Sequence, residues 1–367
     1  MNNQRDCSYY EAHAADVCLD EITSSDYNKR ALQRLRDGDI SNISVGAIWR
    51  NFVITEGDDL GWLEYFISRS ESLQELEVVG FPKVEEEKEQ QIIHALSDGI
   101  TRNRSIQNVC VNNLSRDGFA AVARILSNLT QLESLTVIRR VYGGSDQLYY
   151  VALGNLLEAG VWKLKELSMY DSLIGDAGLA ALTGGLRCIG SSLKGLYLPN
   201  CSIGDEGLST LAEVLANCTC LESLDLSEND FSMTAAGLRF MRSIGSSLKR
   251  LYLSNSAIDS EGLSTLVAAL VDCTCLKVLD LSQNDFSTAA GLRSLSHWVQ
   301  TAALTLDELS LKWCEINDNG VQALAEGAAN NCKEMNLHCN GITALGWRNL
   351  SILLPSESCC LESLILT

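Results

Sequence analysis

The sequence predicts an α/β solenoid, a fold made by stacking copies of one strand-and-helix repeat. Three observations predict it: a near-duplication inside the chain, a leucine pattern that returns about every 29 residues, and a change of apolar spacing within each repeat. The composition agrees, because 46% of the 367 residues are apolar and only 3 are proline. Such a chain is expected to fold without long structureless linkers.

The duplication is plainest between Ser192–Arg239 and Ser247–Arg293. One copy begins SLKGLYLPNCSIGDEGLSTLAEVL and the other begins SLKRLYLSNSAIDSEGLSTLVAAL. Each copy holds two repeats of the form L-x-x-L-x-L-x-x-N/C-x-I/F. An irregular repeat is expected to precede the others at Ile40. Alignment on the first apolar residue places the other starts at Leu73, Ile106, Leu132, Leu164, Leu193, Leu221, Leu248, Leu276, Leu306, Cys332 and Leu361.

Within one repeat, the spacing of apolar residues changes from that of a strand to that of a helix. Leu224 and Leu226 alternate with polar residues, as in a short strand with one buried face. Asn229 follows at a turn, where an asparagine side chain can hydrogen-bond backbone groups at the strand end. The second half of a repeat, such as Asp205–Leu215, shows helical spacing behind a capping aspartate. Because one repeat cannot bury both its faces alone, the repeats are expected to stack.

These repeats resemble the leucine-rich repeat family, in its ribonuclease-inhibitor-like subclass. The residues at the turn position are Cys201, Asn229, Ser256, Asn284, Cys314 and Asn340. Near-alternation of Cys-type and Asn-type repeats is a habit of this subclass. The resemblance implies a right-handed α/β horseshoe with a parallel sheet on its concave side and helices on its convex side. It also implies protein binding, since catalysis by such repeats alone is uncommon. The early repeats carry Phe81, Leu114 and Arg140 at the turn position, which leaves the register before Leu164 open.

The two ends of the chain depart from the repeat pattern. Residues 1–38 show no repeat, and Asp26–Arg36 reads as a short helix bounded by Gly38. We predict an N-terminal helical cap over residues 1–38 and a repeat domain over residues 39–367, with about eleven repeats of which the first and last are irregular. The C-terminal CLESLILT stops just after a strand. That strand is expected either to cap the sheet, to continue in a longer chain, or to pair with another molecule.

The composition is acidic, with 47 Asp and Glu against 28 Lys and Arg and a formal charge of −19. This balance argues against nucleic acid and anionic membranes as partners, because both need neutralising cations. It permits a basic protein partner. The first residues include Asp6, Glu11, Asp16 and Asp20 and no apolar run typical of a signal peptide. We therefore expect a cytoplasmic monomer without a membrane span, whose 14 cysteines are reduced thiols.

No histidine stands in a catalytic or metal-binding motif, and we expect no cofactor. The histidines are His13, His94, His297 and His338, and none lies at ligand spacing from another. Cys339 follows the last of them, and the pair is expected in a strand, with the two side chains on opposite faces. We therefore predict no joint site for His338 and Cys339.

Two cysteine pairs could suggest zinc. They are Cys218 with Cys220 and Cys273 with Cys275, and they recur because the double repeat recurs. Helices pack roughly 8–10 Å apart, so equivalent positions two repeats apart are too distant for one shared zinc site. We predict no metal site.

One column of side chains is predicted to face away from the core, because the residue between the last two leucines of a strand points to the open face. Its members are Glu77, Cys110, Thr136, Ser168, Tyr197, Asp225, Tyr252, Asp280, Ser310 and Asn336. Exposed aromatic rings dominate interface energetics, and interleaved carboxylates steer a cationic partner. We therefore predict a non-catalytic scaffold that binds a protein partner there. The predicted binding residues are Tyr170, Tyr197, Asp225, Tyr252, Asp280, Glu308 and Trp313.

Two other functions stay open. Ran GTPase-activating proteins share this repeat type, so the chain could regulate a small GTPase. That role needs groups that stabilise phosphoryl transfer, and Arg139 and Arg140 are the adjacent basic pair at a strand end. The chain also resembles the sensor part of a larger immune or ubiquitin-ligase assembly.

Overall fold

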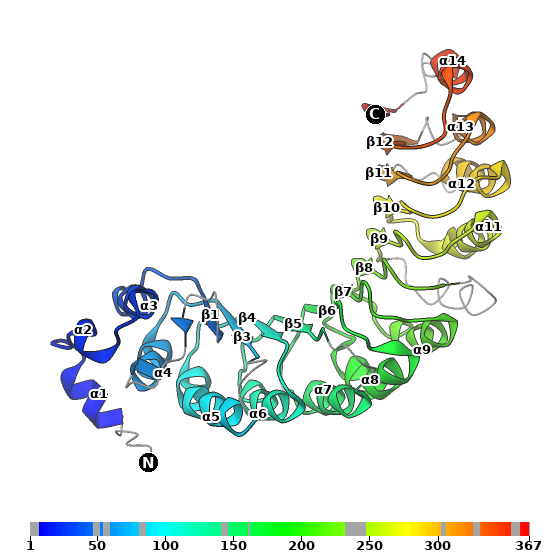
Figure 1. Cartoon of the computed structure of the whole chain (residues 1–367). Helices are drawn as coiled ribbons and strands as arrows, with labels where there is room; N and C mark the ends of the chain where they lie inside the picture. Colours follow the sequence, from blue (N-terminus) through cyan, green and yellow to red (C-terminus); the bar gives the residue numbers. More distant parts are fainter. Residues whose placement is uncertain are drawn as a thin grey trace. The chain divides into compact units, whose positions relative to one another are not determined.

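Strands and helices alternate along the chain, as the repeat pattern predicts (Figure 1). The fold is that of a computed structural model of the whole chain. The structure describes residues 7–46, 52–53, 59–80, 86–140, 146–160, 162–231, 247–301, 306–325, 331–353 and 360–366. The chain forms two compact units, Met1–Ser168 and Met169–Thr367, which we call the N-terminal and C-terminal units. The boundary falls inside strand β6, Glu166–Tyr170.

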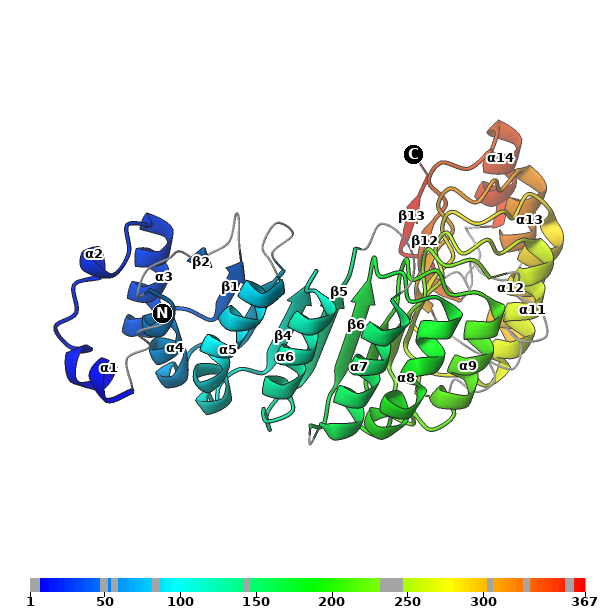
Figure 2. The same ribbon diagram turned by 60° about the horizontal axis from the view of Figure 1, so that its bottom comes forward.

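The N-terminal unit is a parallel sheet with helices along one of its faces (Figures 1 and 2). Its strands follow the order β2-β1-β3-β4-β5. The strands are β1 (Asn42–Gly46), β2 (Phe52–Val53), β3 (Glu75–Val79), β4 (Asn108–Asn112) and β5 (Ser134–Ile138). The helices are α1 (Cys7–His13), α2 (Leu19–Ile22), α3 (Asp26–Asp37), α4 (Asp59–Arg69), α5 (Glu86–Arg102), α6 (Arg116–Leu126) and α7 (Gln147–Ala159).

The C-terminal unit repeats the same architecture, with its strands in sequence order from β7 to β13. They are β7 (Gly195–Tyr197), β8 (Ser223–Asp225), β9 (Arg250–Tyr252), β10 (Val278–Asp280), β11 (Leu306–Ser310), β12 (Cys332–Asn336) and β13 (Ser363–Ile365). The helices are α8 (Gly175–Ile189), α9 (Asp205–Leu215), α11 (Ser260–Ala269), the 3₁₀ helix η1 (Leu270–Asp272), α12 (Ala289–Thr301), α13 (Asp318–Ala325) and α14 (Ala344–Leu353). The predicted α/β solenoid is confirmed.

The register of the early repeats, which the sequence left open, follows the alignment from Leu73. Leu76 of β3 pairs with Val109 of β4, and Ile43 of β1 pairs with Leu76. All three side chains are buried. The irregular repeat at Ile40 is therefore part of the sheet, and its strand is β1.

The N-terminal cap contains more structure than the sequence predicts. The expected helix is α3. It begins after Ser25, whose side chain accepts a hydrogen bond from the Asn28 backbone N–H. It ends before Gly38, which adopts the left-handed conformation. Helices α1 and α2 were not predicted. The buried Asn28 side chain donates a 2.7 Å hydrogen bond to Asp59 of α4, so a polar contact ties the cap to the irregular repeat that starts at Ile40.

One asparagine side chain, buried at Asn229 and Asn284 and part-buried at Asn340, organises the turn of each double repeat. Asn229 Oδ1 accepts from the backbone N–H groups of Cys201 and Ile203, at 3.1 and 3.0 Å. Asn229 Nδ2 donates to the carbonyl oxygens of Leu198, Leu226 and Ser227, at 2.8 to 3.1 Å. Asn284 repeats this pattern towards Ser256, and Asn340 towards Cys314. The turn of a Cys-type or Ser-type repeat is thus hydrogen-bonded by the asparagine of the next repeat.

The cysteines at the turn position are structural. Cys201 Sγ lies 2.9 Å from the Met169 carbonyl oxygen, and Cys314 Sγ lies 3.2 Å from the Leu281 carbonyl oxygen. Burial raises the pKa of the Cys314 thiol to about 12 and raises that of Cys201 as well. Both are inert thiols at neutral pH, and no disulfide links the cysteines whose side chains the structure describes.

Asn229→Ala tests the role of the turn asparagine. The substitution leaves buried backbone groups of two repeats without partners, so we expect the free energy of unfolding to fall by about 3 kcal/mol. Chemical denaturation followed by circular dichroism measures this change. The matched control is the exposed Asn217→Ala, expected to change stability by less than about 0.5 kcal/mol. Equal stabilities of the two variants would contradict the role assigned to Asn229.

Candidate functional site

The centre of the predicted column lies in the C-terminal unit, on the open face of the sheet opposite its helices. Asp225 pairs in register with Tyr197 on one side and with Tyr252 on the other. Tyr252 pairs in turn with Asp280, which pairs with Ser310. Neighbouring strands lie about 4.8 Å apart, so each aspartate stands beside at least one phenol ring. We call Tyr197, Asp225, Tyr252 and Asp280 the Tyr-Asp column.

The Tyr-Asp column is half-exposed, whereas the leucines next to it in the chain are buried. Leu196 and Leu198 on either side of Tyr197 are fully buried, as the period of a strand requires. The Tyr197 ring lies along its own strand over Gly195. A Cβ at Gly195 would come within 2.7 Å of the ring atom Cε2. The missing side chain at Gly195 therefore makes room for the ring on the open face.

Both aspartates of the column hydrogen-bond the end of their own strand through one oxygen. Asp225 Oδ1 accepts from the Ser227 backbone at 2.9 Å. Asp280 Oδ1 accepts from the Ser282 backbone at 2.9 Å and from its hydroxyl at 2.5 Å. The Ser227 side chain also hydrogen-bonds the Asp225 carboxylate. These contacts hold each carboxylate in place on the half-exposed face.

The column and its flank form an electrostatically coupled acidic group. Partial burial raises the pKa of Asp225, and the charge of Asp280 adds to this shift. Burial also raises the pKa of Glu308 and of Tyr252, and the Glu334 and Asp280 charges add to the shift at Glu308. Burial is the main cause of these shifts, and the charge of Arg250 on β9 opposes the shift at Tyr252.

The remaining predicted residues lie on the flanks of the column. Glu308 is exposed and pairs in register with Glu334 and Val278. Trp313 is 54% exposed in the turn after β11, and Tyr170 is half-exposed at the end of β6. The structure therefore leaves all seven predicted residues at least partly accessible. It brings four of them together in one column.

The N-terminal part of the long column differs from the centre. Glu77, Cys110 and Thr136 pair in register, as predicted. Both oxygens of Glu77 are used within the unit, because Ser44 donates to Oε2 at 2.6 Å and Asn112 donates to Oε1 at 3.1 Å. The open carboxylates are those of the C-terminal unit.

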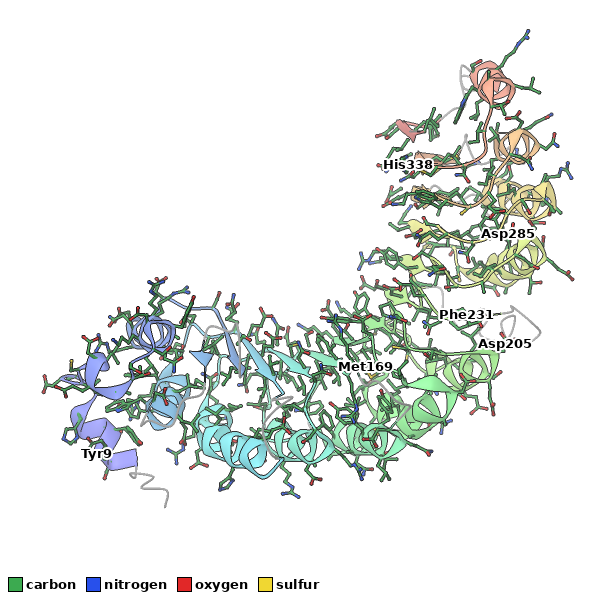
Figure 3. The ribbon with its side chains drawn as sticks, in the orientation of Figure 1. Tyr9, Met169, Asp205, Phe231, Asp285 and His338 are labelled. Atoms are coloured by element: carbon green, nitrogen blue, oxygen red, sulfur yellow. The ribbon has the colours of Figure 1, made fainter. Side chains whose placement is uncertain are left out.

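A second acidic groove of the C-terminal unit was not predicted. An open cavity of about 970 Å³ lies along the turns that follow the strands. Asp285, labelled in Figure 3, is one of its lining residues. Asp176 Oδ1 accepts from the Gly204 backbone at 2.8 Å, and Asp259 Oδ1 accepts from the Gly262 backbone at 2.7 Å. Asp285 Oδ1 accepts from the Ser287 backbone at 3.0 Å. These aspartates cap turns and a helix start, and the aspartates that follow the turn residue in several repeats are the signal that could have revealed them.

The arrangement of His338 and Cys339 corrects the prediction. Strand β12 ends at Asn336, so both residues lie in the following turn. Cys339 has a φ of 54°, and its Sγ lies 3.0 Å from His338 Nε2. The two side chains meet instead of pointing to opposite faces, because the left-handed residue breaks the alternation of the strand.

The paired cysteines each combine one buried and one exposed thiol. Cys218 and Cys273 are buried, and burial raises the pKa of each to about 11. Cys220 and Cys275 are exposed. Within the ranges that the structure describes, no group of three His, Cys, Asp or Glu side chains could hold a metal ion.

Arg139, nominated as a GTPase-directed residue, is a packing residue of the N-terminal unit. It is 9% exposed, and its guanidinium lies 2.8 Å from Asp146 and 3.0 Å from the Leu114 carbonyl oxygen. Its Cζ lies 4.2 Å from the centroid of the Tyr149 ring. These contacts occupy the side chain, so in this conformation Arg139 cannot reach a nucleotide bound outside. Arg140 is exposed.

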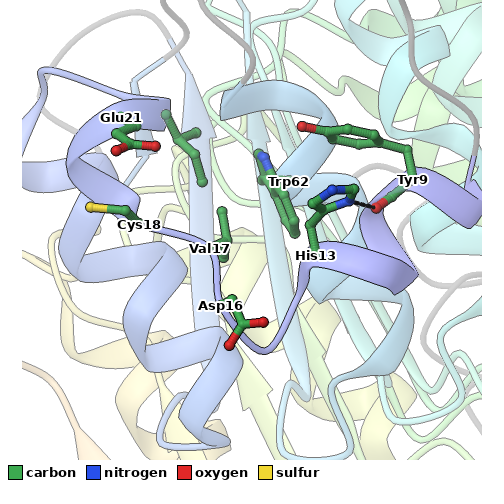
Figure 4. A pocket seen from close by; sticks show the side chains of 8 residues that line it. Tyr9, His13, Asp16, Val17, Cys18, Glu21 and Trp62 are labelled. Carbon is green, nitrogen blue, oxygen red and sulfur yellow. Dashed lines mark hydrogen bonds between the residues drawn. The ribbon is translucent and has the colours of Figure 1, made fainter.

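The cap carries a cavity of about 360 Å³ (Figure 4). Its lining residues are Tyr9, His13, Asp16, Val17, Cys18, Glu21, Ile22 and Trp62. The Tyr9 and His13 rings stack at 4.4 Å, and Trp62 is buried against the Tyr10 ring at 4.9 Å. The rings hold α1 against α4, and this packing accounts for their presence in the cavity wall.

Arg139→Ala tests the structural role of this arginine. The change removes the guanidinium that bonds Asp146 and the Leu114 carbonyl, while Arg116 remains 3.8 Å from Asp146, so we expect the free energy of unfolding to fall by about 2 kcal/mol. Denaturation curves of the variant and of the exposed Arg104→Ala control measure it. A fully stable Arg139→Ala variant would return Arg139 to the list of candidate functional residues.

Comparison with known proteins places these observations in a family. A model described as Leucine Rich repeat matches residues 191–212, 217–238, 246–267, 272–296 and 303–325. The chain is 27% identical over 277 residues to NACHT, LRR and PYD domains-containing protein 14 of Mus musculus, covering 74% of this chain and 28% of that protein. It is 28% identical over 207 residues to ribonuclease inhibitor of Mus musculus, covering 55% of this chain and 45% of the inhibitor. The chain thus spans less than half the length of these relatives.

Solved structures of low sequence identity are also similar. An internalin (inlF) from Listeria monocytogenes str. 4b F2365 matches with a TM-score of 0.47 and 17% identity, over 94% of this chain and 96% of that chain. The Rad7 and Elc1 complex in yeast matches with a TM-score of 0.48 and 16% identity, over 97% of this chain and 79% of that chain. No helix in the described ranges is long and apolar enough to cross a membrane. The repeat period, the turn residues and the sequence relatives agree. The chain is a leucine-rich repeat protein of the ribonuclease-inhibitor-like subclass, related to ribonuclease inhibitor and to the repeat regions of NACHT, LRR and PYD domains-containing proteins.

Proposed function

We propose that this chain is a non-catalytic scaffold that binds a basic protein through the Tyr-Asp column and its flank. The observation that carries the proposal is the in-register alternation of tyrosine and aspartate on an open, half-exposed face. The proposed contact residues outside the column are Tyr170, Glu308 and Trp313.

The chemistry of the column suits a lysine or arginine side chain. The half-exposed carboxylates of Asp225 and Asp280 can accept from a cation, while the neighbouring phenol rings offer their faces to its charge and its methylene groups. Such rings contribute contact area at a small cost in side-chain entropy. Carboxylates at this spacing set the orientation and the rate of encounter more than the affinity.

The relatives support a protein partner. One relative is, by its printed name, an inhibitor of ribonuclease, so its target is itself a protein. We propose the same general mode for this chain: a cytoplasmic monomer, capped by residues 1–38, that presents the sheet of residues 39–367. The formal charge of −19 favours a basic partner through long-range attraction.

A second candidate is a sensor or adaptor part of a larger assembly. It is favoured by the similarity to NACHT, LRR and PYD domains-containing protein 14, which covers 74% of this chain. Affinity purification with mass spectrometry distinguishes the two, because this candidate requires a stable complex with the other components of such an assembly.

Replacing Tyr197 and Tyr252 with alanine tests the column directly. Removing both rings is expected to weaken binding of a basic partner by about 2–4 kcal/mol, because hot spots are aromatic and central. Biolayer interferometry with a panel of basic proteins, a basic ribonuclease among them, measures the affinity. The control is Tyr27→Ala in the cap, a tyrosine that is 64% exposed and far from the column in the chain. If the double variant and the control bind a confirmed partner equally well, the column is not the binding site.

The pH dependence of binding is a second test. Asp225 and Glu308 have raised pKa values, so they take up protons at a higher pH than ordinary carboxyl groups. A cationic partner binds their ionised form, and its Lys and Arg stay charged, so affinity is expected to fall as the pH drops from 7 to 5. Asp225→Asn with Asp280→Asn should lower the affinity at pH 7 and flatten this dependence. The exposed Asp272→Asn should do neither. An affinity that is constant from pH 7 to 5 would count against the carboxylates.

A further inference from the structure

The turn after β12 places a thiol against an imidazole. Cys339 Sγ and His338 Nε2 are 3.0 Å apart, within hydrogen-bond distance for sulfur. Cys339 is exposed, and it occupies the left-handed position that Trp313 and Gln283 occupy in the two preceding repeats. Cys339 is therefore not one of the turn cysteines that hold the fold, because Asn340 fills that position here.

Backbone hydrogen bonds fix the main chain of His338, and one aromatic ring packs against its imidazole. The His338 N–H donates to Asn336 Oδ1 at 3.0 Å, and its carbonyl oxygen accepts from the Trp313 N–H at 3.0 Å. The Trp313 ring meets the imidazole edge-on, with centroids 6.3 Å apart. Nδ1 is buried and has no hydrogen-bond partner among the described residues. His338 lies on the strand side of the C-terminal unit (Figure 3). The Cys339 thiol is exposed, so a small molecule can reach it.

We propose that Cys339 is a modification site at which His338 acts as general base for thiol–disulfide exchange with a small-molecule disulfide. A general base within hydrogen-bond reach of the thiol is the arrangement that activates a cysteine nucleophile. Nε2 takes the thiol proton as Sγ attacks one sulfur of the disulfide. The disulfide bond of the small molecule breaks and a mixed disulfide forms on Cys339. The released thiolate then takes the proton from the imidazolium, so one thiol is oxidised and one is released.

The same unit contains matched cysteines that lack this base. Cys220 and Cys275 are exposed, as Cys339 is. The side-chain neighbour of Cys220 is the Thr219 hydroxyl at 4.0 Å, and no described residue hydrogen-bonds the Cys275 thiol. A hydroxyl does not take up a proton at neutral pH. Exposure alone therefore predicts equal reactivity of the three thiols, whereas the proposed base favours Cys339.

The test uses the full chain, folded and reduced, with oxidised glutathione as the probe at pH 7. Peptide mass spectrometry follows the mixed disulfide at Cys339, Cys220 and Cys275 in the same sample. We expect Cys339 to react at least ~10-fold faster than the other two, a threshold set below the roughly 100-fold low end of general-base effects. In denaturant, where the turn is lost, the three rates should become equal within about twofold.

His338→Gln keeps a polar side chain of similar reach but cannot accept the proton. It should bring the rate at Cys339 to within about twofold of Cys220 and Cys275 and leave the rates of those two unchanged. The control His297→Gln, on an exposed histidine of α12, should change none of the rates. Circular dichroism confirms that each variant is folded. Equal rates of the three cysteines in the native wild type, or an unchanged rate at Cys339 in folded His338→Gln, would overturn the proposal. Neither outcome bears on the Tyr-Asp column.

Discussion

A buried turn after each strand is the constraint on which the rest of this fold depends. Where a parallel strand ends inside a stack of repeats, its backbone N–H and C=O groups have no water to bond, and leaving them unpaired costs free energy. Asn229, Asn284 and Asn340 pair these groups across two repeats at once. An intervening repeat can then carry a small side chain, Cys201 or Ser256, since its N–H groups are already bonded from the next repeat. The alternation of turn residues is a consequence of this sharing.

The same constraint separates structural positions from positions that are free to bind. Leucines face the helices and the asparagines face the turn, so the strand side chains that a partner could reach lie on the open face. In the C-terminal unit those positions hold tyrosine and aspartate, and the aspartates use one oxygen each to finish the strand. A partner would meet carboxylates that are already oriented, which reduces the entropy lost on binding.

The contacts of the candidate functional residues also separate those with a structural role from those without one. Arg139 and the aspartates of the second acidic groove have partners that explain their presence by packing and capping. Cys339 and His338 have no such explanation, because the structural turn residue of their repeat is Asn340. A residue type alone therefore does not mark a site in a repeat protein. A candidate site is indicated by a polar contact that has no role in packing or capping the repeat.

The sequence by itself determined the repeat, the strand register from Leu164 onward and the column on the open face, because these depend on a local periodicity that recurs in each repeat. The register of β1 to β5 follows the leucine alignment even where Phe81, Leu114 and Arg140 replace the usual turn residues. Only the tertiary structure decided the burial of Arg139, the packing of α1 against Trp62 and the meeting of Cys339 with His338. The first two depend on segments separated by loops, and the third depends on one residue with positive φ. Side-chain period predicts which face a residue occupies in a regular element, but it does not predict contacts made across loops or through a left-handed turn.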